Sequence, residues 1–182
     1  MSKVPGTASQ IYSAALGVAA LGATNAVLGD TAMANGATTL VNSGITAPDV
    51  ARNLTVTGNA ASVAGNVVIA GTNQAGEAIS ETIVAAGTAT VVGTKAFATV
   101  TSITLPAYAS AGTERIRVGT GAKLGLPVSM NRDTVLHAYL GGTKEATRPT
   151  VTNSGASREL NTVTLNSALN GSAVVVDYYE SN

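Results

Sequence analysis

From residue 53 to the end of the chain, short runs of β-branched and apolar residues recur about every ten residues, separated by turn-forming residues. In the run 53–57, polar and apolar side chains alternate, which is typical of a strand with one buried face. Alternating helices are absent from this pattern, which disfavours a doubly wound α/β fold. The sequence therefore predicts a mainly β protein, with antiparallel strands packed as a β-sandwich or barrel-like domain.

The same pattern predicts individual strands. A hairpin is expected in which 67–70 and 78–84 flank the loop 71–76, because Asn and Gly accept the positive φ angles of tight loops. The dipeptide Asn170-Gly171 predicts a second hairpin between two β-like runs. Further strands, including those of the second hairpin, are expected at 88–92, 97–105, 115–118, 134–140, 162–165 and 173–179.

The first part of the chain has a different character, because Val4 to Gly29 contains no charged residue. Five apolar residues at helical spacing predict a helix over about 8–28, namely Ile11, Ala14, Ala15, Val18 and Leu21. Gly17 and Gly22 weaken a helix, and an extended arm suits the same composition. The segment is too rich in alanine and glycine for a typical membrane-spanning helix, and a cleaved signal sequence ending near Ala26 is a further alternative.

Three regions follow from these differences. Residues 1–45 are expected to form an N-terminal arm or short helix, and 46–128 a β domain. Residues 129–182 are expected to form β hairpins, which either complete the same domain or make a small second β unit. The 182-residue length permits both arrangements.

Charge is scarce and balanced. Ten basic and ten acidic residues give a net charge of zero, which disfavours nucleic-acid binding because that requires a surplus of Lys and Arg. Charged residues make up 11% of the chain, less than half the usual share of about 25%. Aromatic residues make up only 3%, so the core consists of small side chains. This composition suits a subunit that is covered by neighbours in an assembly.

The glycine-rich stretch VGTGAKLGLP, residues 118–127, is a candidate phosphate-binding loop. A Walker-type loop needs a hydroxyl residue after its lysine, but Leu124 follows Lys123. The glycines give G-x-G-x-x-x-G, one residue longer than the dinucleotide fingerprint, and Pro127 disfavours a following helix. We therefore predict that a strand ends at Val118, that a glycine-permitted turn follows, and that the chain leaves it extended.

His137 is the only histidine, and the chain has no cysteine, so a typical zinc site is not expected. On an alternating strand His137 would share a face with Val135 and Tyr139 and be half-buried. A Ser-His-Asp triad would need His137 with Asp133 or Asp177, yet no serine lies in a G-x-S-x-G elbow.

The remaining charged residues suggest surface roles. Glu77 and Glu81 are four apart, so they are expected on the same side of one strand, as a solvated face rather than an acid–base pair. Arg115 and Arg117 would share a strand face, where they would either meet an acidic patch on a partner or keep a sheet edge soluble. Asp133 beside Arg132 is expected in a surface turn. The sequence thus predicts no catalytic, cofactor-binding or metal-binding residue, and no enzyme.

Four pieces of sequence between residues 48 and 127 occur in a fixed order: PDVARNLTVTG, GTNQAGEAISET, GTKAFATVTSITLP and VGTGAKLGLP. In this order they resemble a group of small virion structural proteins of tailed bacteriophages. The resemblance covers about 80 residues, and it leaves the first 40 residues and the region from about 130 without a counterpart. Ala51 is a departure, because the group's pattern has proline at this position.

The resemblance implies a non-enzymatic virion protein, most like a decoration (cement) protein on the capsid exterior. Its partners would then be the major capsid protein and further copies of itself, without nucleic acid, membrane or cofactor. A decoration protein spans junctions between capsid subunits, where many weak contacts together stabilise the shell. The alternative within the same class is a tail-tube subunit or a head or tail fibre protein, although the chain lacks the aromatic platforms and long repeats of fibres.

Overall fold

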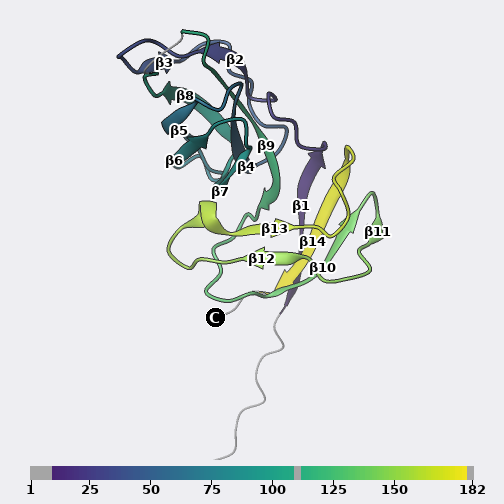
Figure 1. Cartoon of the computed structure of the whole chain (residues 1–182). Coiled ribbons are helices and arrows are strands. Elements are labelled where there is room, and N and C mark those ends of the chain that lie inside the picture. The colour runs from purple at the N-terminus through teal and green to yellow at the C-terminus, as the bar shows by residue number, and fades with distance from the viewer. Residues whose placement is uncertain (1–9, 109–111, 180–182) are drawn as a thin grey trace, which may run out of the picture.

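The protein is described here by a computed structural model, which covers residues 10–108 and 112–179 (Figure 1). Its described part is mainly β, and its only helical element is a short 3-10 turn, η1 (Arg158–Leu160). Every pair of neighbouring strands is antiparallel. The predicted class, an antiparallel sandwich or barrel-like β protein, is therefore confirmed.

Fourteen strands form three sheets in the described residues. Sheet I has the order β1-β14-β10-β11, with bounds β1 (Ile11–Ala19), β10 (Val135–Leu140), β11 (Thr143–Lys144) and β14 (Ser172–Tyr179). Sheet II has the order β12-β13-β9-β4-β7, and β2 also pairs with β9; its bounds are β2 (Leu28–Ala32), β4 (Arg52–Gly58), β7 (Val91–Phe97), β9 (Arg115–Gly125), β12 (Thr150–Thr152) and β13 (Thr162–Thr164). Sheet III has the order β3-β8-β5-β6, with bounds β3 (Thr39–Val41), β5 (Ala64–Thr72), β6 (Ala78–Ala86) and β8 (Thr99–Leu105).

Of the two alternatives for the N-terminal segment, the extended one is found. Residues 11–19 form β1, which pairs antiparallel with β14, so the first and last described strands lie side by side (Figure 1). Leu16 and Ala19 are buried there, and Gly17 occupies a β-bulge with a φ of 101°. The apolar residues that fitted a helical spacing are thus shared between two faces of a strand. Cleavage near Ala26 would remove this strand from sheet I.

Two clusters of buried side chains hold the sheets together. The first lies between sheet III and part of sheet II and includes Ile69, Phe97 and Ile103. The second lies under sheet I and includes Val163 and Val174. In Figure 1, β9 runs from the part of the molecule that contains sheet III toward the part that contains sheet I. Its side chains follow the same path, because Ile116 and Val118 belong to the first cluster and Leu124 to the second.

The predicted turn in VGTGAKLGLP is wrong, because β9 continues without interruption to Gly125. The glycines serve close packing of the backbone instead of a turn. A Cβ atom on Gly119 would overlap the carbonyl oxygen of Ala23, and one on Gly121 would overlap the side chain of Asn53. Gly119 and Gly121 therefore let neighbouring segments approach a strand at distances that a side chain would prevent.

The first predicted hairpin is confirmed. Strands β5 and β6 pair over nine residues, and the turn between them is closed by Asn73. Its Oδ1 accepts the backbone N–H groups of Ala75 and Glu77 at 2.9 and 3.1 Å. Gly76 provides the positive φ, 79°, that this turn requires.

Two other predictions about strands are wrong. No hairpin joins 162–165 to 173–179, because β13 belongs to sheet II and β14 to sheet I. Gly171 does have the positive φ of a turn, 81°, but the chain uses this turn to cross between sheets. The strand expected at 88–92 starts only at Val91 and continues to Phe97, whereas the strand expected at 97–105 is present as β8, which starts at Thr99.

Replacing Gly119 with alanine should destabilise the protein strongly. The new methyl group would overlap the backbone at Ala23, and overpacking of this kind costs about 1–3 kcal/mol in the free energy of unfolding. Denaturant unfolding of the full chain measures this loss. Gly29→Ala is the matched control, because nothing lies within 4 Å of a Cβ at Gly29 and its free energy of unfolding should change by less than about 0.5 kcal/mol. Equal stability of the two variants would contradict the close approach at Gly119.

Candidate interaction surfaces

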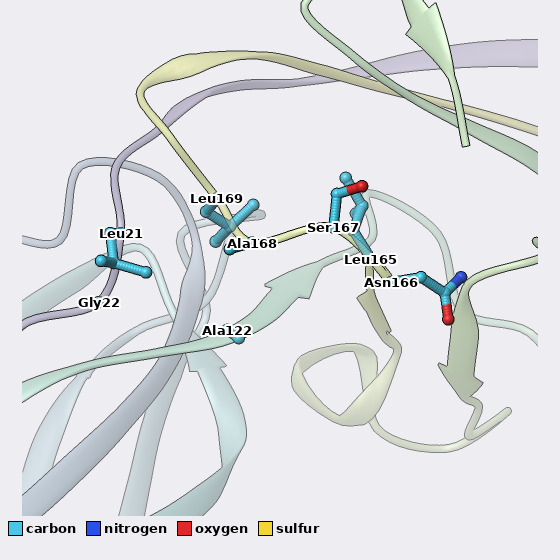
Figure 2. Close-up of a pocket in the computed structure, with 8 residues that line it drawn as sticks. All are labelled: Leu21, Gly22, Ala122, Leu165, Asn166, Ser167, Ala168 and Leu169. Atoms are coloured by element: carbon cyan, nitrogen blue, oxygen red, sulfur yellow. The ribbon is translucent and has the colours of Figure 1, made fainter. Parts of the chain in front are cut away.

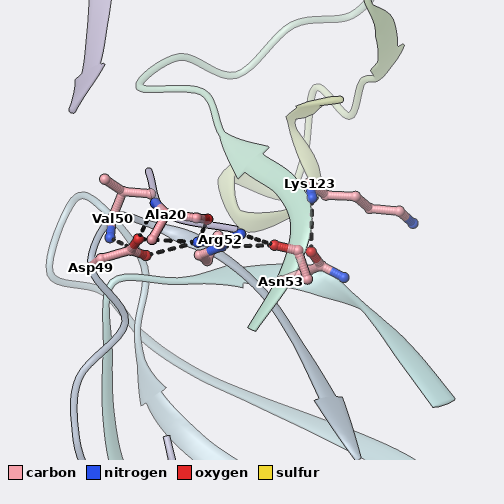
Figure 3. Close-up of polar contacts among 7 residues, drawn as sticks. Ala20, Asp49, Val50, Arg52, Asn53 and Lys123 are labelled. Atoms are coloured by element: carbon pink, nitrogen blue, oxygen red, sulfur yellow. Dashed lines mark hydrogen bonds and ion pairs between the residues drawn. The ribbon is translucent and has the colours of Figure 1, made fainter. Parts of the chain in front are cut away.

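A buried arginine connects three segments of the chain. Arg52, at the start of β4, has no exposure to solvent. Its Nε donates to the carbonyl oxygen of Gly121 in β9 at 2.7 Å, and its Nη2 donates to the same oxygen. Its Nη1 donates to the carbonyl oxygen of Ala20, just after β1, at 3.0 Å and to the Asp49 carboxylate at 2.9 Å (Figure 3). The guanidinium group therefore fastens β4, β9 and the segment that leaves β1.

Asp49 is held as a carboxylate at this position. Its Oδ2 accepts the N–H of Ala20 at 2.7 Å, and its Oδ1 accepts that of Val50 at 3.0 Å. Desolvation by burial raises the pKa of this carboxyl group, but the hydrogen bonds from Ala20, Arg52 and Val50 and the charge of Arg52 outweigh it. The net result is a pKa below the ordinary value for aspartate.

Asn53, the next residue, bridges a break in sheet II. The register of β4 shifts here against both of its neighbours, β7 and β9. The Nδ2 of Asn53 donates to the carbonyl oxygen of Gly93 in β7 at 3.0 Å. Its Oδ1 accepts the N–H of Lys123 in β9 at 2.9 Å (Figure 3). A single buried side chain thus supplies hydrogen bonds to both neighbouring strands where the main-chain ladder is interrupted.

Glu81 closes the contact between sheets III and II, so the prediction of a solvated glutamate pair is wrong for this residue. Its Oε1 accepts the backbone N–H and the hydroxyl of Thr94 in β7 at 2.6 and 2.8 Å. A Cβ on Gly93 would come within 2.6 Å of the Glu81 carboxylate, so the glycine leaves room for it. Glu77 lies in the hairpin loop, exposed, and accepts a hydrogen bond from Asn73 at 2.6 Å. Each glutamate has its own partners, and nothing in their contacts supports an acid–base pair.

The four sequence pieces 48–58, 71–82, 93–106 and 118–127 meet at these contacts. The piece 48–58 supplies Arg52 and Asn53, which bond to the backbone of the piece 118–127. The piece 71–82 supplies Glu81, which bonds to the backbone of the piece 93–106. Arg52, Asn53 and Glu81 thus connect strands from different pieces of the chain through hydrogen bonds to the backbone.

The outer face of sheet I has a small polar cluster. The Oγ of Ser13 donates to Asp177 at 2.5 Å, and the Tyr139 hydroxyl also hydrogen-bonds to Asp177. Desolvation, this hydrogen bond and the charge of Asp177 raise the pKa of Tyr139 above its ordinary value. The Nε2 of His137 lies 3.3 Å from the Nζ of Lys144.

His137 is exposed, so its predicted half-burial beside Val135 is wrong. A register shift between Val135 and His137 turns Val135 inward, while His137 pairs in register with Asp177 on the outer face. Ser13, His137 and Asp177 do share this face, but the serine bonds directly to the aspartate and the histidine contacts Lys144. A catalytic triad places the histidine between the other two, and this order of contacts does not do so.

Asp133 and Arg117 each pair with a charged residue of the same chain. Asp133 accepts the N–H of Val135 at 3.1 Å and pairs with Arg148 at 2.5 Å. Arg117 pairs with Asp30 at 3.8 Å, while Arg115 is exposed. Because β9 lies between β4 and the strands β2 and β13, the idea that these arginines protect a sheet edge is wrong.

A shallow cleft lies where the loop after β13 faces the segment that follows β1 (Figure 2). Leu21 and Gly22 line one side, Ala122 of β9 the floor, and residues 165–169 the other side. The lining residues include no charged side chain. Its polar side chains are Ser167 and Asn166, and the Nδ2 of Asn166 donates to the carbonyl oxygens of Thr147 and Arg148. Small-molecule sites usually have several polar groups that converge on an apolar cleft.

The outer face of sheet III is free of charge. Leu40, Thr104, Val68 and Thr82 form one cross-strand row on it, and Leu40 and Val84 are 62% and 57% exposed. Every outward-facing residue of β3, β5, β6 and β8 is Ala, Val, Leu, Ser, Thr or Asn. A partner can cover this uncharged surface without desolvating a charge.

Comparisons of the chain with profiles of protein families, with curated proteins and with solved structures give no match. Within residues 10–108 and 112–179, no helix is long and apolar enough to cross a membrane. Over the same residues, no group of three or more His, Cys, Asp or Glu side chains is placed to hold a metal ion.

Asp49→Asn should reduce the acid sensitivity of the fold. The pKa of Asp49 is lower in the folded protein than in the unfolded chain. The contribution of Asp49 to the free energy of unfolding is therefore complete above the unfolded-state pKa of about 4, and it is lost as the pH falls through the lower folded-state pKa. The variant should lose about 1 kcal/mol or more at pH 7 and show a smaller further loss below pH 4 than the wild type.

Urea unfolding at a series of pH values from 7 to 3 measures both effects. Asp30→Asn removes the same formal charge from a half-exposed ion pair and is the control for net charge. An acid-side loss of stability as steep in Asp49→Asn as in the wild type would show that Asp49 does not contribute in this way.

Proposed function

We propose that the protein is a non-enzymatic virion structural protein that binds the outside of a capsid shell and stabilises it as a decoration protein. The resemblance of residues 48–127 to phage virion proteins supports this class. The single structural observation that supports the proposal is the uncharged outer face of sheet III, which we take as the surface that binds the shell. Leu40 and Val84 are its most exposed large side chains.

This face suits attachment by many weak contacts. Its small side chains allow a partner's backbone to come close, and its threonine hydroxyls exchange hydrogen bonds with water for hydrogen bonds with a partner. Thr72 and Thr99 already pair their hydroxyls across β5 and β8 at 2.7 Å, which orders this part of the face. Each contact is modest, since little area is buried per residue. Repetition over the lattice of a shell makes the total attachment strong.

The hydrogen bonds that connect the sheets agree with such a role. Glu81 and Asp49 accept backbone N–H groups within the protein, so their charges stabilise the subunit and are absent from the outer face of sheet III. A rigid subunit with an uncharged face transmits load between the capsid subunits it contacts. Internal pressure from packaged DNA is then resisted by the lattice as a whole.

Thr82→Lys should weaken binding to capsids at least tenfold. The lysine would stand in the central row of the outer face of sheet III, and burying its charge against a partner is costly. Co-sedimentation of the purified protein with isolated heads that lack it, and with isolated tails, measures the affinity for each.

Ala173→Lys is the matched control, because it adds the same charge to an exposed position in β14, on sheet I. It should bind heads as the wild type does. Wild-type binding to tails instead of heads would favour a tail-tube or fibre protein over a decoration protein. Unchanged binding of Thr82→Lys to heads would show that another surface makes the contact.

A further inference from the structure

Strand β1 has one side without a partner strand. It stands at the end of sheet I and pairs only with β14 among the described strands. The backbone N–H and C=O groups on its other side therefore lack a sheet partner, and such an edge is a template for an additional strand.

The other sheet edges are short or covered, so β1 stands out among the described strands. Strands β3, β11 and β12 have two or three residues each, whereas β1 has nine. The edges of β6 and β7 face each other and are joined through Glu81. The five-residue β2 includes a charged residue, Asp30. Short length, charge and cover are the usual means by which proteins protect sheet edges.

β1 has almost none of this protection. Its sequence, IYSAALGVA, contains neither a charged residue nor a proline. Ile11 and Val18, near its two ends, are 61% and 57% exposed, and Gly17 is exposed as well, which leaves its backbone open to solvent. The bulge at Gly17 is the only irregularity, and 11–15 is a regular stretch in register with β14.

We infer that β1 pairs antiparallel with β1 of a second copy of this chain, so that two four-stranded copies of sheet I form one continuous sheet across a two-fold axis. An antiparallel edge is self-complementary about such an axis, because each strand offers the other the same pattern of donors and acceptors. No charge in β1 repels an identical strand. The exposed Ile11 and Val18 side chains lose solvent exposure on pairing, which adds an apolar contribution to the backbone hydrogen bonds.

Ala15→Lys tests the pairing directly, because Ala15 is exposed in the regular part of β1 and a lysine there places a charge in the edge that a second copy would have to cover. Sedimentation equilibrium of the full chain over about 1–100 μM measures self-association. The wild type should form a dimer, and Ala15→Lys should raise the dimer dissociation constant at least tenfold. Ala173→Lys is the matched control, since it places the same charge on the same face of sheet I but on a strand with partners on both sides. It should dimerise as the wild type does.

Hydrogen exchange on the wild-type protein gives an answer even if Ala15→Lys does not fold. The backbone amides of 11–18 should exchange more slowly as the concentration rises, while those of β10 should not change. Three results would each overturn the inference. The wild type could remain monomeric throughout this concentration range, a folded Ala15→Lys could associate as tightly as the wild type, or the exchange rates of the β1 amides could be independent of concentration. The purified chain alone is measured, so the result is independent of whether the protein binds capsids.

Discussion

Arg52 places a positive charge where no solvent reaches it, so its N–H groups must find acceptors within the protein. The acceptors come from the carboxylate of Asp49 and from the carbonyl groups of Ala20 and Gly121. Ala20 lies in the segment that leaves sheet I, Gly121 lies in the strand shared by both buried clusters, and Asp49 lies in the loop before β4. The position of sheet I relative to the rest of the molecule therefore depends on a charged side chain that cannot move to water without leaving its partners unsatisfied.

Polar side chains also connect strands at two other places in the fold. Asn53 supplies hydrogen bonds where the ladder of β4 is broken on both sides, and Glu81 joins two sheets that no main-chain ladder connects at that point. In a protein with only 3% aromatic residues, each buried side chain contributes little area, and side chain–backbone hydrogen bonds gain in relative importance. Using these polar residues for the joints leaves the outer face of sheet III uncharged.

Local sequence patterns predicted what depends on local interactions. Alternation and the Asn73 turn identified the β5–β6 hairpin, because both strands and their turn are contiguous. The same reasoning failed where a distant partner decides the structure. β1 is a strand because β14 lies beside it, about 160 residues later in the sequence, and the glycines of β9 are needed for Ala23 and Asn53. The bulge before His137 likewise has no local signal, and it reverses which face the histidine occupies. Arg52, Asn53 and Glu81 were not identified as structural residues, although the glycines opposite them were a usable sign of close approach.

We propose that the surfaces of this β subunit attach it to a capsid shell. Cryo-electron microscopy of complete particles that contain the protein tests this claim most directly. We expect repeated density on the capsid exterior, at junctions between capsid subunits, into which the described chain fits with sheet III facing the shell. Density confined to the tail, or particles without any density for the protein, would contradict it.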